Sequence, residues 1–470
     1  MTIRLHDTLS GVDQPLEPLE PDHVRVYSCG PTVYGPAHIG NFRSFLFADL
    51  LVRHLRRSGL RVTWVMNITD IDDKIIKGAR EAGASIQELS DRWCSVFLAD
   101  ADRLGMVRPD VLPRATGHID EIVGLITTLL EGGHAYRTDD GSIFFRIASW
   151  PAYGRLARVD PDEMRVGERV EADEYAKDDV RDFVLWKGPK GDEPSWDTAI
   201  GPGRPGWHIE CSAMSMKHLG PSFDIHTGGI DLIFPHHEDE IAQSEAATGR
   251  TFVRTWMHCA HLQSSGSKMA KSVGNIARVG ALLDAGISAR ALRYALIAVH
   301  YRAANQYSDE ALLAAGAAVE RLEALVAALR AYREDRPDDR GLADGLAAAQ
   351  SAFSAALDDD LNVSAALAVA FDLLRDLNRR IDGRTMSSGD AERALGVFRS
   401  FDEVLGVLPT DEGELGEELR SLLDERSAAR AKRDWAASDR LRDELASRGI
   451  AVEDTRDGQR WRRQLEAARG

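Results

Sequence analysis

Cysteine is scarce in this sequence. Four occur among 470 residues, at positions 29, 94, 211 and 259, and no two lie close together along the chain. This spacing excludes a scaffold built on disulfides and is typical of a reduced, cytoplasmic protein. Long apolar runs are also missing, because no stretch approaches the roughly 18 apolar residues of a membrane helix. We therefore expect neither a membrane span nor, from the polar first ten residues, a secretory signal.

Positive charge is in deficit over the whole chain, with 58 Lys and Arg against 75 Asp and Glu, a net charge of −17. An acidic protein repels nucleic acid unless basic side chains are concentrated locally. Residues 420–470 reverse the balance, with 13 Lys and Arg against 10 Asp and Glu. Composition leaves two interpretations of this tail open: contact with a polyanion, or a solvated helical surface.

Internal repeats and low-complexity tracts are absent as well. The composition, 44% hydrophobic and 28% charged, is that of a soluble globular protein. At about 150 residues per domain, the length predicts roughly three domains.

The N-terminal half alternates strand-like and helix-like segments. Residues 23–30 and 61–70 are rich in β-branched and aromatic side chains, and residues 39–58 between them have a helical pattern. Strand signals return at 222–229 and 251–262. A strand–helix–strand order of this kind predicts a parallel sheet.

The other segments differ in character. Residues 85–135 look helical, and we expect another helix from Pro235. Residues 136–205 are rich in Gly, Pro and charge, and we interpret them as an irregular insertion between two halves of the sheet. From about 280 to 450, alanine and leucine recur with helical periodicity. The sequence thus predicts an α/β fold followed by a mostly helical part.

One short motif with chemical potential opens the first helix, at residues 36–41. A phosphate placed there would meet helix amides and their positive dipole, and His38 could bond to a phosphate oxygen. Gly40 would let a flat base approach the backbone. Alone, the motif fits equally a helix start with a half-exposed histidine.

A second motif carries two lysines, Lys268 and Lys271, after the flexible segment 264–267. Two lysines in a mobile loop suit a polyphosphate whose charge shifts during reaction, although alone they also fit a charged surface loop. Together the two motifs resemble the HIGH and KMSKS signatures of class I aminoacyl-tRNA synthetases. Asn41 and Ala270 depart from those signatures, since they replace the final histidine and the serine.

A third constellation has the chemistry of a metal site. His236 and Glu240 stand four residues apart and would share one helix face, whereas His237 would point about 100° away. Cys29 and Cys211, each beside a predicted strand end, add soft ligands. Two cysteines, one histidine and one glutamate form a reasonable tetrahedral zinc set. Buried cysteines beside a capped polar helix are the alternative.

Nearly the whole chain resembles the cysteinyl-tRNA synthetase family. The matching stretches are YSCGPTVY (27–34), NITDIDDKII (67–76), PGWHIECSAM (205–214), FDIHTGGIDLIFPHHEDEIAQ (223–243), KMAKSVGN (268–275), HYRAANQYSDE (300–310), ALDDDLNV (356–363) and RDELASRGIAVEDTRDGQRWR (442–462). The family's zinc ligands fall on Cys29, Cys211, His236 and Glu240.

The resemblance implies an α/β architecture with a Rossmann-like parallel-sheet catalytic domain, an insertion, a helical bundle and a small anticodon-binding domain. The expected segments are a first catalytic half (1–120), an insertion (121–204), a second catalytic half with the zinc ligands (205–263), a lysine-loop and connecting fold (264–312), a helical bundle (313–415) and an anticodon-binding domain (416–470).

The resemblance also implies a two-step reaction. ATP, entering with Mg²⁺, and L-cysteine give cysteinyl-adenylate, and the cysteinyl group then passes to the 3′ end of tRNA(Cys). One zinc ion per chain binds the substrate thiolate and so separates cysteine from serine. The family is commonly monomeric.

Roles for individual residues follow from the same resemblance. His38, Lys268 and Lys271 are the expected catalytic residues, and with Gly40 and Asn41 they form the ATP site. The amino-acid pocket is expected at Thr69, Trp207, His226 and Asp231. The residues that read the anticodon are expected at Arg430, Trp435, Asp439 and Asp454. Cys94 and Cys259 match no ligand position, and Cys94 has the pattern of a buried helical residue.

Two other functions remain open at this point. A cysteine ligase of mycothiol synthesis shares the catalytic half but lacks the tail, so WAASDRLRDEL (435–445) disfavours it. A catalytically weakened paralogue that binds tRNA is the other alternative, kept open by Asn41 and Ala270.

Overall fold

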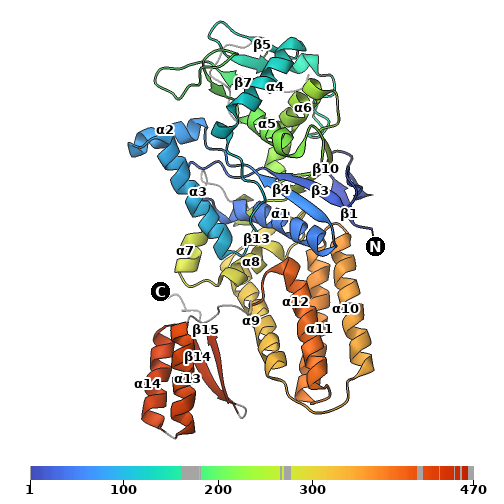
Figure 1. The fold of residues 1–470 in the computed structure, drawn as a ribbon, viewed down its shortest axis with the longest axis vertical. Helices are drawn as coiled ribbons and strands as arrows, with labels where there is room; N and C mark the ends of the chain where they lie inside the picture. Colours follow the sequence, from blue (N-terminus) through green and yellow to red (C-terminus); the bar gives the residue numbers. More distant parts are fainter. Residues whose placement is uncertain are drawn as a thin grey trace.

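The computed structural model describes residues 2–159, 179, 181–264, 267–268, 277–409, 417–432, 434–448, 450–455 and 458–463. It is an elongated molecule with a four-stranded parallel sheet in its middle (Figure 1). The strands lie in the order β10-β9-β3-β4. They span β3 (His23–Ser28), β4 (Arg61–Met66), β9 (Phe223–Gly229) and β10 (Val253–Cys259), which confirms the four strands expected from the sequence.

The order of the strands places the site. The chain moves outward from β3 to β4, and later returns to add β9 and β10 on the other side of β3. The topology therefore reverses between β3 and β9. In open α/β sheets, ligands bind at such a reversal, beyond the carboxyl ends of the strands.

Helix α1 (Ile39–Arg57) connects β3 to β4 and buries Ile39, Phe42 and Leu46. His38 caps its start: the ring accepts the Asn41 backbone N–H at 3.1 Å, and the Asn41 side chain accepts the His38 N–H at 3.1 Å. This reciprocal capping box satisfies two backbone donors that the first turn would otherwise leave unpaired. Helices α2 (Asp73–Ala82) and α3 (Ile86–Arg103) follow β4.

The insertion is more regular than its composition indicated. An antiparallel sheet in the order β5-β6-β7-β8 runs through it, so the expectation of irregular structure over 136–205 is wrong for the described residues. Its strands are short, which conceals the alternation that identifies a strand. The elements are α4 (Ile119–Glu131), β5 (Ala135–Arg137), β6 (Ile143–Phe145), β7 (Phe183–Lys187), β8 (Arg204–Pro205) and α5 (Trp207–Leu219).

The helix expected from Pro235 is confirmed. Within Ile233–His237 only Phe234 departs from helical dihedral angles, and it marks a kink, after which the backbone stays helical through His236 and His237 into α6 (Glu238–Thr248). His236 and Glu240 therefore lie one turn apart on the same helix face, as expected.

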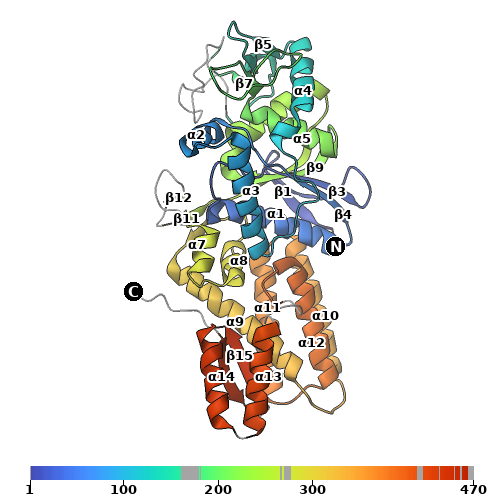
Figure 2. The same cartoon turned by 60° about the vertical axis from the view of Figure 1, so that its left-hand side comes forward.

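The C-terminal part is mostly helical, as predicted. Its elements are α7 (Val279–Asp284), α8 (Ala289–Ile297), α9 (Asp309–Ala331), α10 (Arg340–Asp358), α11 (Val363–Asp382), α12 (Ser388–Leu405), α13 (Glu417–Ala431) and α14 (Trp435–Ser447). Helices α9–α12 form a bundle on the side of the central sheet opposite the insertion, and α13 and α14 lie beside the lower part of that bundle (Figure 2). A hairpin of β14 (Ile450–Thr455) and β15 (Gly458–Arg463), absent from the sequence prediction, packs against α14.

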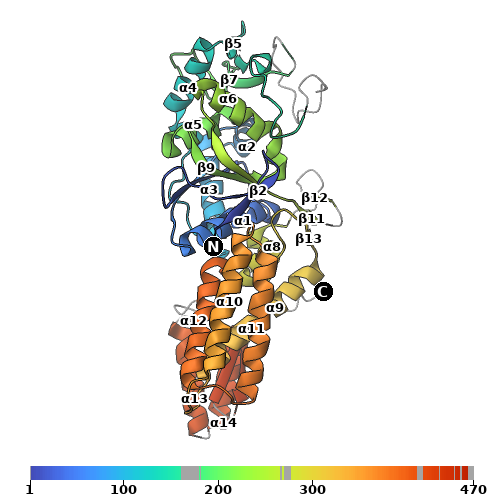
Figure 3. The ribbon, with the colours of Figure 1, turned by 90° about the vertical axis from the view of Figure 1, so that its right-hand side faces the viewer.

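Two small sheets complete the fold. A hairpin of β1 (Arg4–Asp7) and β2 (Val12–Pro15) covers β10. Strands β11 (Leu262–Ser264), β12 (Ser267–Lys268) and β13 (Asn305–Tyr307) lie between the central sheet and the helical part (Figure 3). Within the part of the chain that the structure describes, no helix is both long and apolar enough to cross a bilayer.

Candidate metal centre and active site

Four potential metal ligands meet at the carboxyl edge of the sheet. Cys29 follows β3, Cys211 lies on α5, His236 lies in the turn before α6, and Glu240 lies in the first turn of α6. Their ligand atoms all fall within 4.8 Å of one another. The structure thus brings together the four residues selected from the sequence, at the topological reversal of the sheet.

The contacts within this cluster are close, and most of its side chains are buried. Cys29 Sγ lies 3.8 Å from Cys211 Sγ and 3.7 Å from Glu240 Oε1, and His236 Nε2 lies 3.1 Å from the same carboxylate oxygen. Cys211, His236 and Glu240 are buried, and Cys29 is half-buried. All four cysteines of the chain are free thiols.

The ionisable groups of the cluster shift one another's pKa values. Burial opposes ionisation of Glu240, but His226 and His236 outweigh it and lower the pKa of Glu240 to about 2. Burial also opposes protonation of His236, but Glu240 and Cys211 raise the pKa of His236 to about 10. A hydrogen bond from Cys29 lowers the pKa of Cys211 to about 6, while burial raises that of Cys29. The donor groups are acidic, and a bound cation can take the place of their protons and neutralise their negative charge.

His237 does not point away from the cluster, so that sequence expectation is wrong. Its Nε2 lies 3.4 Å from Cys29 Sγ, and its Nδ1 lies 2.8 Å from His258 Nε2. The backbone is helical at His236 and His237, so the two rings leave the helix in different directions, but Cys29 and Glu240 offer ligand atoms within 4.8 Å of both.

Asn67 holds the loop that carries Cys29, a role the sequence reasoning missed. Its side chain accepts the Gly30 N–H at 2.8 Å and donates to Thr69 Oγ1 at 3.1 Å. A Cβ on Gly30 would lie 1.8 Å from the Asn67 carbonyl oxygen, so this approach requires glycine. Thr69, expected in the amino-acid pocket, is buried and pairs through its backbone with Pro31 and Val33.

The two acidic residues between His237 and Glu240 anchor the insertion. Glu238 accepts the backbone N–H groups of Gly154, Leu156 and Ala157 at 2.7, 2.8 and 2.9 Å. Asp239 accepts the hydroxyl of Tyr153. Both carboxylates are buried. In the sequence, the run of acidic residues at the start of an otherwise apolar helix was the signal that could have indicated this anchoring role.

The expected pocket residues surround the cluster on different sides. Trp207 stacks on the ring of His236 at 4.2 Å, and His226 Nε2 donates to Glu240 Oε2 at 3.1 Å. Asp231 is exposed, just beyond the end of β9. The Asp231 carboxylate is therefore accessible to the amino group of a small molecule that enters from solvent.

The start of α1 pairs with the segment beyond the lysine motif. The Ile39 N–H donates to the Ala277 carbonyl at 3.0 Å, and His38 pairs with Arg278 in a single β-bridge. Residues 277 and 278 lie shortly after the matching stretch 268–275. The Lys268 side chain, Ala270 and Lys271 lie outside the described residues.

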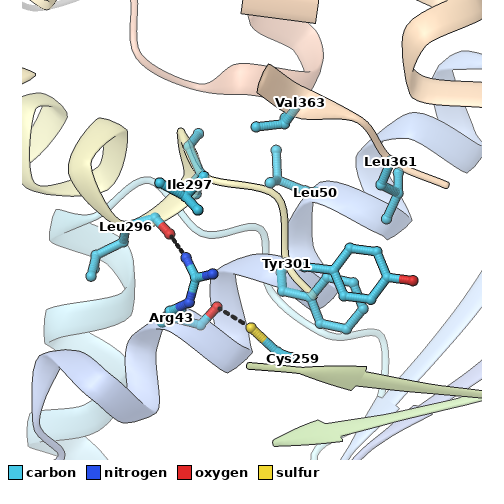
Figure 4. A pocket seen from close by; sticks show the side chains of 10 residues that line it. Arg43, Leu50, Cys259, Leu296, Ile297, Tyr301, Leu361 and Val363 are labelled. Atoms are coloured by element: carbon cyan, nitrogen blue, oxygen red, sulfur yellow. Dashed lines mark hydrogen bonds between the residues drawn. The ribbon is translucent and has the colours of Figure 1, made fainter. Parts of the chain in front are cut away.

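Buried Arg43 ties α1 to the base of the lysine motif. It donates to the carbonyls of Ala260 and Leu296 at 3.0 and 2.8 Å, and to those of His300 and Ala303 at 3.2 and 2.7 Å. Figure 4 shows its guanidinium reaching the Leu296 carbonyl beside a small pocket at this junction. No sequence pattern marked this arginine.

In the C-terminal region, the Arg430 guanidinium lies over the Trp435 ring, 5.5 Å from its centre. Trp435 remains 55% exposed, so it is not a packing residue between the two helices. Asp439 is exposed on the same helix, α14, and the side chain of Asp454 lies outside the described part.

Three family models match the chain. Residues 15–317 match the tRNA synthetases class I (C) catalytic domain, residues 352–409 the DALR domain, and residues 412–462 the cysteinyl-tRNA ligase anticodon binding domain. The cysteine–tRNA ligase of Solibacter usitatus is 45% identical over 470 residues, spanning 98% of this chain and 100% of the relative. This chain belongs to the cysteine–tRNA ligase family. The cysteine–tRNA ligase of Symbiobacterium thermophilum is likewise 45% identical, with the same coverage.

Solved structures of other synthetases share the fold. Methionyl-tRNA synthetase from Mycobacterium tuberculosis, in complex with methionyl-adenylate, superposes with a TM-score of 0.60 at 18% identity, covering 82% of this chain and 90% of that one. A leucyl enzyme from Agrobacterium radiobacter, in a ternary complex, gives 0.61 at 13% identity, covering 83% and 85%. Fold class and family are thereby confirmed, and the chain is a class I aminoacyl-tRNA synthetase.

Proposed function

We propose that this chain joins L-cysteine to tRNA(Cys) through a cysteinyl-adenylate, and that a zinc ion at Cys29, Cys211, His236 and Glu240 selects the substrate by its sulfur. The observation that carries the proposal is the four-donor cluster at the reversal of the sheet, beside the nucleotide-binding start of α1. The curated relatives named cysteine–tRNA ligase support the reaction.

The donor set fits zinc. Two thiols, one imidazole and one carboxylate are ligands that zinc takes in a tetrahedral arrangement, and the cluster is largely buried. Bound there, zinc would supply a Lewis acid that prefers a thiolate to a hydroxyl and makes the thiolate available at neutral pH. An apolar pocket alone separates such near-isosteres by only about 1–3 kcal/mol.

Activation needs little proton transfer. The carboxylate of free cysteine is already a nucleophile, so the protein's task is to neutralise the charge that develops on the triphosphate. His38, Lys268 and Lys271 take that role, with the amides at the start of α1 beside Gly40 and Asn41. Mg²⁺ enters with ATP, and exposed Asp231 accepts the substrate's amino group.

The C-terminal region reads the anticodon in this proposal. The Trp435 ring is open to solvent on one face and covered by Arg430 on the other, an arrangement that suits stacking on an unpaired base. Asp439 and Asp454 would accept from base amino groups. We further propose a cytoplasmic monomer, as expected from the sequence.

Pyrophosphate exchange tests the proposal. The purified protein should catalyse exchange that depends on cysteine, and chelation should abolish it until Zn²⁺ is returned. Serine should support at least a thousandfold less exchange, beyond the reach of an apolar pocket. Exchange that survives complete zinc removal would overturn the metal's role.

Charging assays separate the alternatives. Transfer of cysteine to tRNA excludes a mycothiol-type ligase. A protein that binds tRNA but shows no exchange, even after Asn41→His and Ala270→Ser, would be the weakened paralogue instead.

A further inference from the structure

The lysine segment, residues 265–276, runs between two stretches of chain that both contact the start of α1. After the segment, the Ile39 N–H donates to the Ala277 carbonyl at 3.0 Å. Before it, strand β11 packs against α1 near Gly40, where a Cβ would lie 3.8 Å from Leu262 Cβ. The same helix therefore borders the lysine segment on both sides.

Arg43 is a buried side chain of α1 that joins the helix to both of the strands beside this segment. Its guanidinium donates to four backbone carbonyl groups: Ala260 at 3.0 Å, Leu296 at 2.8 Å, His300 at 3.2 Å and Ala303 at 2.7 Å. Ala260 lies between β10 and β11, whereas the other three lie at the end of α8 and in the turn before β13. One side chain thus ties the approaches to β11 and β13 to α1.

Strands β11 and β13 set where the lysine segment begins. They pair in parallel, with Leu262 opposite Asn305 and Ser264 opposite Tyr307. The segment follows directly after Ser264, so a shift of either strand relative to α1 would move its starting point. Because Arg43 bonds to the chain that leads into each strand, it determines how the segment is placed against the start of α1.

The buried charge of Arg43 suits this task better than a smaller or neutral group. Burial lowers the pKa of Arg43, and within the described residues its charge is met by carbonyl dipoles rather than by a carboxylate. The Leu296 carbonyl lies at the C-terminal end of α8, where the helix dipole favours a cation. A guanidinium has five donors in a fixed plane, whereas an ammonium has three on a flexible stem. Only the guanidinium can bond to all four carbonyl groups at once.

We propose that Arg43 is a positioning residue for the activation of cysteine. It fixes the base of the lysine segment to the helix that His38 caps, so that His38 and the two lysines meet the same triphosphate. The inference rests on the proposed function, in which these groups neutralise the charge on ATP, and adds a residue that acts only through them. Displacement of a reacting group by about 1 Å can slow a reaction by about a hundredfold, so a residue at the base of the segment can control the rate.

Arg43→Lys tests the proposal, because it keeps a positive charge but cannot bond to four acceptors at once. We expect the kcat for cysteine-dependent pyrophosphate exchange to fall by about tenfold to a hundredfold. The KM for cysteine should stay within about twofold of the wild-type value, because charge on the triphosphate develops in the transition state. Zinc content should not change. Arg43→Gln, which keeps two donors without a buried charge, decides the matter if Arg43→Lys does not fold.

Arg293→Lys is the matched control, because Arg293 is also a buried arginine that bonds to backbone carbonyl groups. It lies on α8, donates to the Leu405 and Leu104 carbonyls at 2.6 and 3.2 Å, and pairs with Asp49. None of these partners borders the lysine segment. Its replacement should lower the free energy of unfolding, measured in urea, as Arg43→Lys does, but should leave the kcat for exchange near the wild-type value.

A double variant shows whether Arg43 acts through the lysine segment. In Lys268→Ala, the segment has lost one of the groups that Arg43 positions. We therefore expect Arg43→Lys to lower the kcat for exchange by a factor at least about threefold smaller in this background than in the wild type, because two residues that act together are not additive. A merely structural role would give the same factor in both backgrounds.

The outcomes separate this inference from the proposed function. Wild-type protein without cysteine-dependent exchange would defeat both. Normal wild-type exchange, together with an unchanged kcat in Arg43→Lys and Arg43→Gln, would overturn the positioning role alone. An equal loss of kcat in Arg293→Lys, or an undiminished effect of Arg43→Lys in the Lys268→Ala background, would also overturn it.

Discussion

Contacts of individual residues fix the position of Cys29. The cysteine follows β3 in a loop with no regular structure, and the loop is fixed by the Asn67 side chain at Gly30 and by backbone pairing with Thr69. Sequence reasoning selected Cys29 and Cys211 as candidate ligands, because soft donors are rare in this chain. It could not find Asn67, because a bond between residues 37 positions apart leaves no local pattern.

Asn67→Ala should therefore affect both stability and the metal. The Gly30 N–H loses its partner, so we expect the free energy of unfolding to fall by about 1–3 kcal/mol. Metal affinity should fall by about tenfold or more, as when an outer support of a metal site is removed. Urea unfolding and competition with a chelator measure the two effects.

Asn362→Ala is the matched control. Asn362 caps α11 by accepting the Ala365 N–H at 3.1 Å, far from the cluster in the chain. Its loss should cost about 0.5–2 kcal/mol of stability and leave metal affinity unchanged. An Asn67→Ala protein that binds metal like wild type would contradict the positioning role.

Helices and strands were predictable where the apolar residues kept one periodicity, helical or alternating, along the whole element. The four strands of the central sheet and the C-terminal helices follow their expected segments. The sheet of the insertion was missed because its strands are two to five residues long. His237 was misjudged for another reason: helical periodicity gives the direction of a side chain, but it does not show that Cys29, from a distant element, meets that side chain.

Helix caps make the bundle sensitive to pH. Asp390, buried at the start of α12, accepts the N–H groups of Ser387 and Asp339 at 2.9 and 3.0 Å and pairs with Arg393. Burial would raise the pKa of Asp390, but these bonds lower it. A carboxylate whose pKa is depressed by folding stabilises the protein above its unfolded pKa of about 3.9, and that stability is lost as the pH falls through the folded value.

Asp390→Asn should remove this pH dependence. We expect its free energy of unfolding to be about 1–3 kcal/mol lower at pH 7, and the gap to wild type to narrow as the pH falls below about 4. Urea unfolding of both proteins across that range measures the gap. A constant gap would show that the carboxylate's charge contributes nothing.

At the scale of the whole molecule, the candidate metal ligands lie far from the C-terminal helices. They come from the end of β3, from α5 and from the start of α6, whereas α13, α14 and their hairpin lie beside the far part of the bundle (Figures 1 and 2). The start of α1 is joined to the segments on either side of the lysine motif independently of that tail, through Arg43 and Ala260 and through the pairing of Ile39 with Ala277.

Removing residues 416–470 should accordingly spare cysteine-dependent pyrophosphate exchange and cripple tRNA charging. The tail carries the chain's local excess of positive charge, so tRNA binding by the full chain should weaken as salt rises. Trp435→Ala should raise the KM for tRNA by the loss of about 1–3 kcal/mol of stacking, and Trp435→Phe should retain most of it. A truncated protein that charges tRNA normally would refute anticodon reading by this region.

The central claim is that substrate sulfur joins the metal held at Cys29, Cys211, His236 and Glu240. The most direct test is the absorption of the Co²⁺-substituted enzyme while L-cysteine, and then L-serine, is added. Our account predicts that cysteine strengthens the sulfur-to-cobalt band in proportion to its occupancy, and that serine at the same concentration leaves the band unchanged. A spectrum that saturating cysteine does not alter would contradict it.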